Sequence, residues 1–280
     1  MLSEHQELSL QAAREAEVFK RNDFIQKARH VLTLQEQRVV LYAISKIKPG
    51  DTPSTEYVLD IKDFYLLCGI ENESYSKLKD ILLKLKSDTW WTVLSDGETE
   101  SALSWFNVVR TNKKSGKVVF KFHEDVMPYL TELKKNGNFY TKYSLQYVLP
   151  MSGRYSPRLY EILKSYHYNN VEWFFDIDNL KWLLSCQHYE NFYDFKRRVL
   201  EPAIEEINKF TDMKIAYETV SEGRRVSRIT FYMKTKSPAD LLTTKKTINE
   251  TLDGAADPLN IDKIIEDYKN STKYKLLTED

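Results

Sequence analysis

Residues 58–64, Val-Leu-Asp-Ile-Lys-Asp-Phe, have a close counterpart in residues 174–180, Phe-Phe-Asp-Ile-Asp-Asn-Leu. Two further pairs of segments keep the same order at almost the same offset: 41–44 with 159–162, and 75–79 with 192–196. Three ordered matches at a nearly constant offset are typical of an internal repeat. The sequence therefore predicts two structurally similar modules in tandem.

The first module has the pattern of three helices and a β-hairpin. Thr33 followed by Glu36 predicts a capping box at the start of a helix. Apolar residues at helical spacing continue that helix to about Lys46, and alternating apolar residues around a glycine-containing turn predict the hairpin. The other expected elements are a strand at 57–59, a helix from its cap Asp60 to about Cys68, a helix from Ser74, and hairpin strands at 104–110 and 117–122.

The second module repeats this plan. Ser156 and Pro157 predict a helix cap followed by proline at the first helical position. The segment 192–210 keeps its apolar stripe through Pro202, where we expect a kink and not a full break. The other expected elements are the end of the first helix near Tyr166, a strand at 173–175, a helix from its cap Asp176 to about Ser185, and hairpin strands at 213–219 and 225–233.

Three helices followed by a hairpin is the plan of a winged helix. The predicted fold class is α+β, with two tandem winged-helix domains related by the internal repeat. The expected divisions are an N-terminal segment 1–21, a first domain 22–137, a linker 138–153, a second domain 154–236 and a polar C-terminal tail 237–280. We expect the tail to be mobile, with one helix at 260–269.

The composition argues against several functional classes. The sequence has no run of about 18 apolar residues, so it predicts no membrane span. Two isolated cysteines are typical of a reducing cytoplasm. The five histidines lack metal-binding spacing, and the eight glycines form neither GxxxxGK nor GxGxxG. We therefore expect a cytoplasmic protein that is not an enzyme and uses no cofactor or metal. A metal-dependent rolling-circle nickase is the third hypothesis, and the missing histidine cluster argues against it.

The net charge is zero, which is unusual for a DNA-binding protein, so the distribution of charge matters. Residues 21–236 hold 33 of the 41 basic and 28 of the 41 acidic side chains. This basic excess is modest. The prediction of DNA binding therefore depends on particular side chains.

The segment 192–210 carries the most informative polar face. Arginine presents a planar fork that matches two acceptors of guanine, and aspartate can accept from cytosine. The alternative is a solvated amphipathic helix with ordinary pairs such as Arg197–Glu201. The side chains predicted to face DNA here are Tyr193, Asp194, Arg197 and Arg198.

Basic residues also mark both wings and the first module. Arg224, Arg225 and Arg228 on the second wing can contact the DNA backbone or enter a minor groove, or they can simply keep a soluble hairpin from pairing at its edge. Lysine suits phosphate contacts better than base contacts. The candidates in the first module are Ser76, Lys77 and Lys84 on the third helix, and Lys113 and Lys114 on the wing.

Residues 194–208, Asp-Phe-Lys-Arg-Arg-Val-Leu-Glu-Pro-Ala-Ile-Glu-Glu-Ile-Asn, resemble the iteron-binding plasmid replication initiators of the Rep-3 type. Shorter segments at 28–38, 156–163 and 223–226 resemble the same family. The resemblance implies two winged helices and monomers that bind direct repeats in double-stranded DNA at a plasmid origin. It also implies a homodimer in equilibrium with the monomer. The DNA contacts that it implies are at Lys196, Arg197, Arg198, Arg224 and Arg225, and at Lys77 and Lys84 in the first module.

The leading hypothesis is therefore a plasmid replication initiator that bends or opens the origin and recruits host replication proteins. A tandem winged-helix transcriptional regulator or autorepressor without a replication role shares every DNA-binding feature. Only the family resemblance separates the two.

Overall fold

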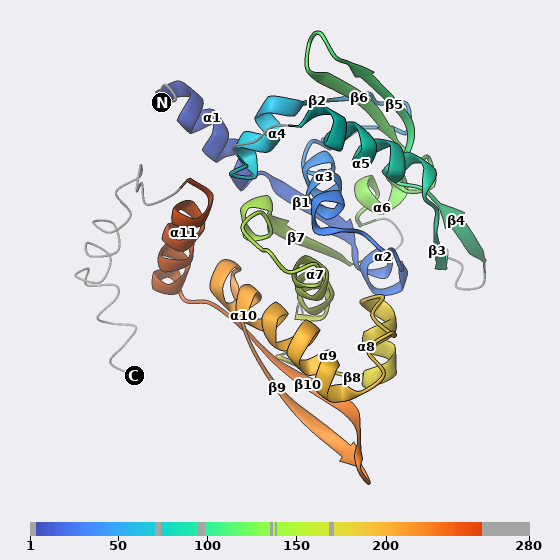
Figure 1. Cartoon of the computed structure of the whole chain (residues 1–280), viewed down its shortest axis with the longest axis vertical. Helices are drawn as coiled ribbons and strands as arrows, with labels where there is room; N and C mark the ends of the chain where they lie inside the picture. Colours follow the sequence, from blue (N-terminus) through green and yellow to red (C-terminus); the bar gives the residue numbers. More distant parts are fainter. Residues whose placement is uncertain are drawn as a thin grey trace.

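The computed structural model describes residues 4–70, 74–93, 99–134, 137, 139–167 and 171–253. Within these ranges two units lie at opposite ends of the molecule, each with a hairpin that projects outward (Figure 1). The first unit contains a three-stranded antiparallel sheet and three helices: α3 (Leu34–Ile44), β2 (Tyr57–Asp60), α4 (Ile61–Leu67), α5 (Tyr75–Ser87), β5 (Phe106–Asn112) and β6 (Lys117–Phe122).

The second unit has equivalent elements in the same order. Its sheet is ordered β8-β10-β9, which matches β2-β6-β5 of the first unit strand for strand. This match confirms the predicted internal repeat, the α+β class and the two winged helices. The elements are α7 (Ser156–His167), β8 (Glu172–Asp176), α8 (Ile177–Leu183), α9 (Phe192–Phe195), η3 (Lys196–Leu200), α10 (Glu201–Phe210), β9 (Met213–Glu222) and β10 (Arg225–Thr235).

Local capping explains where most of these helices begin. Thr33 and Glu36 form the predicted capping box, with each side chain accepting from the other's backbone N–H. Asp60 caps α4 by accepting from two backbone N–H groups, and Asn191 caps α9 by accepting from one, that of Asp194. Ser74 caps α5 by accepting from the backbone N–H of Lys77, so Ser74 and Asn191 fix the starts of the two helices that carry predicted DNA-facing residues.

Two predicted caps are wrong. Asp176 precedes α8 but accepts no backbone hydrogen bond there, and its carboxylate lies 3.7 Å from Arg228 Nε. Asp176 thus pairs with Arg228 across the sheet and does not cap α8. Ser156 is the first residue of α7 and is itself helical, and its buried Oγ has no partner among the described residues.

The segment around Pro202 continues as a helix through one wide turn. η3 is a π-helical turn, and the backbone N–H of Glu201 bonds to the carbonyl of Lys196, five residues back. Pro202 has no N–H and its ring crowds the carbonyl of Arg198. A π-turn directly before the proline accommodates that lost hydrogen bond. The expected kink is therefore a π-turn inside a continuous helix.

The predicted linker and N-terminal segment pair with each other. β1 (Glu17–Arg21) and β7 (Tyr140–Ser144) form an antiparallel sheet, so residues 138–153 are more than a connection. At the two ends of the described range lie helices, α1 (Glu4–Glu15) and α11 (Pro238–Asp253). Elements that the sequence did not predict complete the first half: α2 (Asn22–Lys27), β3 (Trp90–Val93), β4 (Glu100–Leu103), α6 (Met127–Thr131) and η2 (Leu145–Tyr147).

The prediction of a mobile polar tail is wrong for residues 238–253. Ile248, Leu252 and Asn249 of α11 are buried, and α11 packs on α10. Ile248 and Leu252 are its buried apolar residues, whereas Leu241 and Leu242 are half-buried. The tertiary contacts of its buried face therefore stabilise a helix with a weak sequence pattern. The helix expected at 260–269 lies outside the described residues. The boundaries 22–137 and 154–236 stay predictions.

A buried ionic cluster joins the β1–β7 sheet to α7. Lys20 Nζ and Tyr143 Oη both donate to Glu161 Oε1, each at 2.6 Å. Arg158 donates to the carbonyls of Ile25 and Ala28 in and after α2, each at 2.7 Å. Each charge is paired or hydrogen-bonded, as burial requires. The cluster holds the first helix of the second unit against the first unit.

Candidate nucleic-acid interface

The helix formed by α9, η3 and α10 presents one apolar and one polar face. Phe195, Val199, Ala203 and Ile207 are buried, which confirms the predicted stripe. On the other side Tyr193 is 70% exposed, and the side chains of Arg197 and Arg198 are 54% and 57% exposed. Two guanidinium groups near the start of the helix are therefore available to a partner.

Asp194 organises these two arginines. Its carboxylate lies 3.4 Å from Arg197 and 3.6 Å from Arg198, and it accepts a hydrogen bond from Asn191 at 2.8 Å. The Asn191 hydrogen bond and the two arginines lower the pKa of Asp194. The ionised carboxylate thus holds both guanidinium groups beside one another, through exposed pairs that a stronger ligand can displace.

Lys196 lies on the same helix and faces the hairpin. Its ammonium group is 3.4 Å from Glu201, and Tyr217 on β9 together with Glu201 raises its pKa. The side chain is exposed. Lys196 therefore adds a positive charge between the helix and the wing.

The second wing ends in a two-residue turn at Gly223 and Arg224. Gly223 has a φ of +62°, a conformation that glycine adopts without a steric penalty. Arg224 is exposed at the tip, and no ion pair is found for it among the described residues. Arg225 and Arg228 lie on the strand behind it, paired with Asp178 at 3.2 Å and Asp176 at 3.7 Å. The predicted basic tip thus consists of Arg224 at the turn. Behind it lie two exposed arginines, Arg225 and Arg228, each in an ion pair with an aspartate.

The first unit presents a corresponding set of exposed polar side chains, with lysines in place of the arginines. Ser76 and Lys77 are exposed in the first turn of α5, and its apolar stripe, including Leu78 and Leu82, is buried. At the tip of the wing, Asn112 Oδ1 accepts from the backbone of the next turn and leaves the side chains exposed. Those exposed side chains are Lys113 and Lys114.

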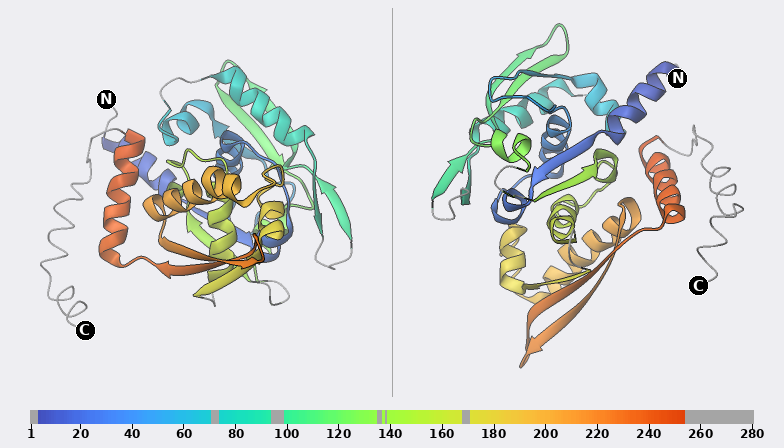
Figure 2. Two further views of the ribbon diagram at one scale, coloured as in Figure 1. Left: turned by 60° about the horizontal axis from the view of Figure 1, so that its bottom comes forward. Right: turned by 180° about the vertical axis from the view of Figure 1, so that it is seen from behind.

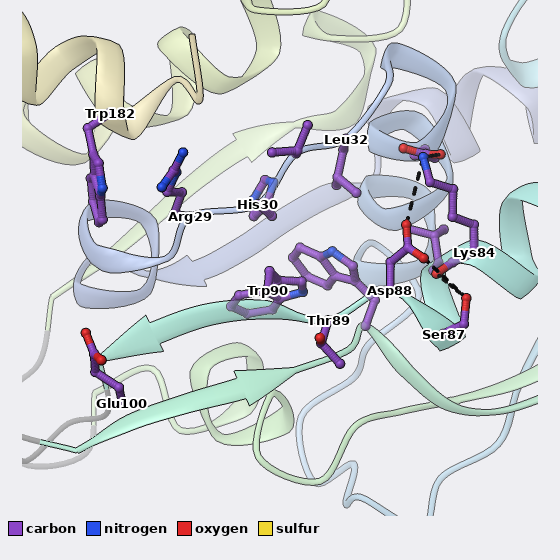
Figure 3. A pocket seen from close by; sticks show the side chains of 14 residues that line it. Arg29, His30, Leu32, Lys84, Ser87, Asp88, Thr89, Trp90, Glu100 and Trp182 are labelled. Carbon is purple, nitrogen blue, oxygen red and sulfur yellow. Dashed lines mark hydrogen bonds and ion pairs between the residues drawn. The ribbon is translucent and has the colours of Figure 1, made fainter. Parts of the chain in front are cut away.

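Lys84 differs from the other predicted contacts. Its ammonium group is 2.9 Å from the buried carboxylate of Glu36 and 4.0 Å from Asp88. It lines a pocket of about 760 Å³, to which α8 contributes Trp182 (Figure 3). The structure therefore places Lys84 in an ion pair at the junction of the two units.

The two helices that carry the predicted DNA-facing residues, hereafter the recognition helices, lie on one side of the molecule. α5 and the α9–α10 helix are uncovered on the face turned to the reader, with the wings at opposite ends (Figure 1). The view from behind shows the β1–β7 sheet on the other side (Figure 2, right). The two helix–wing sets thus face the same side of the molecule.

A family model described as "Initiator Replication protein, WH1" matches residues 17–164, more than half of the chain. A second, "Initiator Rep protein, WH2", matches residues 176–233. The chain belongs to this initiator family. The family consists of DNA-binding replication initiators and not of enzymes, and the two winged helices are hereafter WH1 and WH2.

Two curated relatives come from Escherichia coli. A "Replication initiation protein" is 25% identical over 277 residues, which is 93% of this chain and 84% of the relative. A "PI protein" is 29% identical over 207 residues, 68% of this chain and 66% of the relative. A crystal structure of "Pi initiator protein in complex with iteron DNA" has a TM-score of 0.67 at 23% identity, covering 80% of this chain and 99% of that one. That structure has the same fold.

Sequence reasoning missed the residues that join WH1 to WH2. Lys20 and Glu161 are separated by 141 positions, and Arg14 and Asp253 by 239. No local pattern marks such pairs, because each is an ordinary charged residue until the fold buries it. The only signal was that Arg158 and Glu161 lie in the 156–163 segment that resembles the family.

Within the described ranges the molecule shows neither a membrane-crossing helix nor a cluster of three metal-binding side chains. The helices there are too short or too polar to span a bilayer. His, Cys, Asp and Glu residues do not gather there in groups able to hold a metal ion.

Proposed function

We propose that this initiator binds direct repeats of double-stranded DNA at a plasmid origin, as a monomer with both winged helices on one face of the duplex. The α9–α10 helix of WH2 reads bases in a major groove, and α5 of WH1 lies in a groove about one helical turn, roughly 10 base pairs, away. The protein acts in the cytoplasm.

The observation that carries this proposal is the exposed pair Arg197 and Arg198 on the recognition helix. Their side chains extend from a helix whose other face is buried, so the backbone behind them is rigid. Arginine is the commonest reader of guanine in the major groove. The other proposed contacts of WH2 are Tyr193, Asp194, Lys196, Arg224, Arg225 and Arg228.

WH1 supplies contacts to phosphates in this proposal. Ser76, Lys77, Lys113 and Lys114 are exposed on α5 and its wing, and phosphate contacts position a protein without reading sequence. Lys84 is left out, because Glu36 holds its ammonium group. WH2 is therefore the sequence reader and WH1 the phosphate clamp.

Opening of the origin follows from binding free energy. Several monomers on adjacent repeats bend the DNA and strain a neighbouring AT-rich segment, because deformation energy depends on the sequence being deformed. Recruitment of host replication proteins and a monomer–homodimer equilibrium complete the proposal, and the resemblance to the initiator family supports both.

A plasmid maintenance assay tests the proposal. DNA flanking the gene is cloned into a vector that cannot replicate in the host, and the protein is supplied in trans. We expect a fragment with direct repeats to be maintained, and the Arg197→Ala, Arg198→Ala double variant to abolish maintenance. If no repeat-containing fragment is maintained, the protein is not the initiator of that plasmid. Repression of its own promoter without maintenance indicates the alternative, a transcriptional autorepressor.

A further inference from the structure

The helices at the two ends of the described chain lie outside both family matches and contact each other. α1 precedes residue 17, where the WH1 match begins, and α11 follows residue 233, where the WH2 match ends. Two views show α11, in red, beside α1, in blue (Figures 1 and 2). This contact is an addition to the two winged helices.

Arg14 is the centre of the contact. Its side chain is only 2% exposed, and its guanidinium group donates to both carboxylate oxygens of Asp253, at 2.5 and 2.8 Å. The same group donates to the carbonyls of Leu66 and Leu67, each at 3.2 Å. These carbonyls belong to the last turn of α4. Arg14 therefore ties the end of α11 to the end of α4.

Other contacts reinforce this attachment. Lys245 of α11 is 2.6 Å from Glu15 of α1. Gly69, directly after α4, has a φ of +65°, and a Cβ there would collide with the backbone carbonyl of Leu252. The end of α11 thus lies directly against the turn that follows α4. This turn leads to α5, and α4 and α5 are the two helices of the helix-turn-helix in WH1.

The other end of α11 is attached to WH2. Asp240 in its first turn is 3.1 Å from Lys214 on β9, and α11 packs on α10. α10 continues the WH2 recognition helix, and the turn after α4 leads into the WH1 recognition helix. α11 therefore spans the distance between WH1 and WH2.

We propose that Arg14, Glu15, Lys245, Leu252 and Asp253 form an interdomain clasp that fixes the spacing between the two recognition helices. The clasp would set the separation of half-sites that this protein accepts on DNA. This inference rests on the proposed function. A bidentate arginine–carboxylate pair is geometrically specific, so its loss should loosen the relative placement of WH1 and WH2.

Half-site spacing is the quantity that separates this role from general stabilisation. Inserting one base pair between two half-sites shifts the second by about 3.4 Å and rotates it around the helix axis. A rigid protein loses one set of contacts on such DNA. A protein with a loosened clasp can follow the shifted half-site and keeps part of the contacts made there.

The test compares Asp253→Asn with a charge-matched control, Glu250→Gln. Glu250 lies on the same helix, and its pair with Lys246 at 3.8 Å stays within α11. Both substitutions remove one negative charge, but only Asp253→Asn breaks the clasp. A third variant, Arg14→Lys, keeps the charge and loses the planar fork. The probes are a duplex carrying one footprinted repeat from the flanking DNA and the same duplex with one base pair inserted between its half-sites.

We expect the insertion to weaken binding of the full-length protein and of Glu250→Gln by the same factor. For Asp253→Asn and Arg14→Lys the ratio of the two Kd values should fall by about tenfold, a typical coupling between sites. Equal ratios for all four proteins overturn the clasp and leave the proposed function intact. A full-length protein that prefers no repeat sequence overturns both.

Discussion

At the scale of single residues, the interface depends on which charged side chains are committed to partners. Arg197 and Arg198 share the exposed Asp194, whereas Lys84 is held by the buried Glu36. Exposed pairs contribute little to stability and are readily exchanged for a ligand. A pair with a buried partner is costly to break. Basic residues on two equivalent helices therefore have different roles.

Arg197 and Lys113 should behave differently as DNA contacts. Arg197→Ala should cost about 1–3 kcal/mol of binding free energy and relax sequence preference, as expected for loss of a base contact. Lys113→Ala should weaken binding uniformly and reduce the salt slope by about 1. Salt titrations on specific and random duplexes measure both. Lys142→Ala, on the β1–β7 sheet at the opposite face, is the control. Identical behaviour of Arg197→Ala and Lys113→Ala would refute the division between reader and clamp.

His30 should make the protein sensitive to acid. Burial and the nearby cations Arg158 and Lys20 hold the pKa of His30 well below its usual value, so the folded state favours the neutral ring. Its contribution to stability is complete above the unfolded-state pKa, about 6.5, and is lost as the pH falls below that value. Urea unfolding at pH 7.5 and 5.5 should therefore show a smaller loss for His30→Gln than for the unmodified protein. The idea fails if both lose the same stability.

At the scale of elements, the helix caps separate what a local pattern can predict from what it cannot. Thr33 and Asp60 cap their helices as expected, whereas Asp176, which precedes α8 as Asp60 precedes α4, does not. Both aspartates face a basic residue across their sheets, Lys117 opposite Asp60 and Arg228 opposite Asp176, but among the described residues an ion pair is found only for Asp176, at 3.7 Å. A charged neighbour across a sheet is invisible to a sequence window.

The paired positions Asp60 and Asp176 allow a direct comparison. Asp60→Ala should lower the free energy of unfolding by about 1 kcal/mol, because it removes a cap that accepts from two N–H groups. Asp176→Ala should change it by less than about 0.5 kcal/mol, as usual for exposed positions. Chemical denaturation of the two variants measures both values. A larger loss at Asp176 would contradict the cap assignment.

At the scale of the whole molecule, buried charges hold WH1 and WH2 together. Lys20, Glu161 and Tyr143 form one cluster between the β1–β7 sheet and α7, and the proposed clasp at Arg14 joins α1 to α11. The WH1 family match itself extends to residue 164 and so includes most of α7. α7 therefore belongs to the connection between the two units as well as to the second repeat.

Breaking the buried cluster should cost far more than breaking an exposed pair on the same sheet. Glu161→Gln leaves Lys20 buried without a counter-charge, and we expect a loss of about 3–5 kcal/mol in the free energy of unfolding. Glu17→Gln breaks the exposed Lys142–Glu17 pair on β1 and β7 and should cost less than about 1 kcal/mol. Urea denaturation of both variants compares them directly. Similar losses would show that the cluster does not carry interdomain stability.

The sequence by itself determined the repeated plan and the helix caps at Thr33 and Asp60. It also determined the apolar stripe of 192–210 and the arginines on the opposite face of that helix. These features have local causes: periodicity, capping and turn chemistry within a few residues. Only the tertiary structure decided that α11 is a helix, that β1 pairs with β7, that Asp176 and Lys84 are committed to ion pairs, and that Arg14 meets Asp253. Each of these depends on residues distant in the chain, which no local sequence pattern compares. A buried charge such as Arg14 or Glu36 is costly to remove from water, and it is tolerated because folding brings a partner of opposite charge to it.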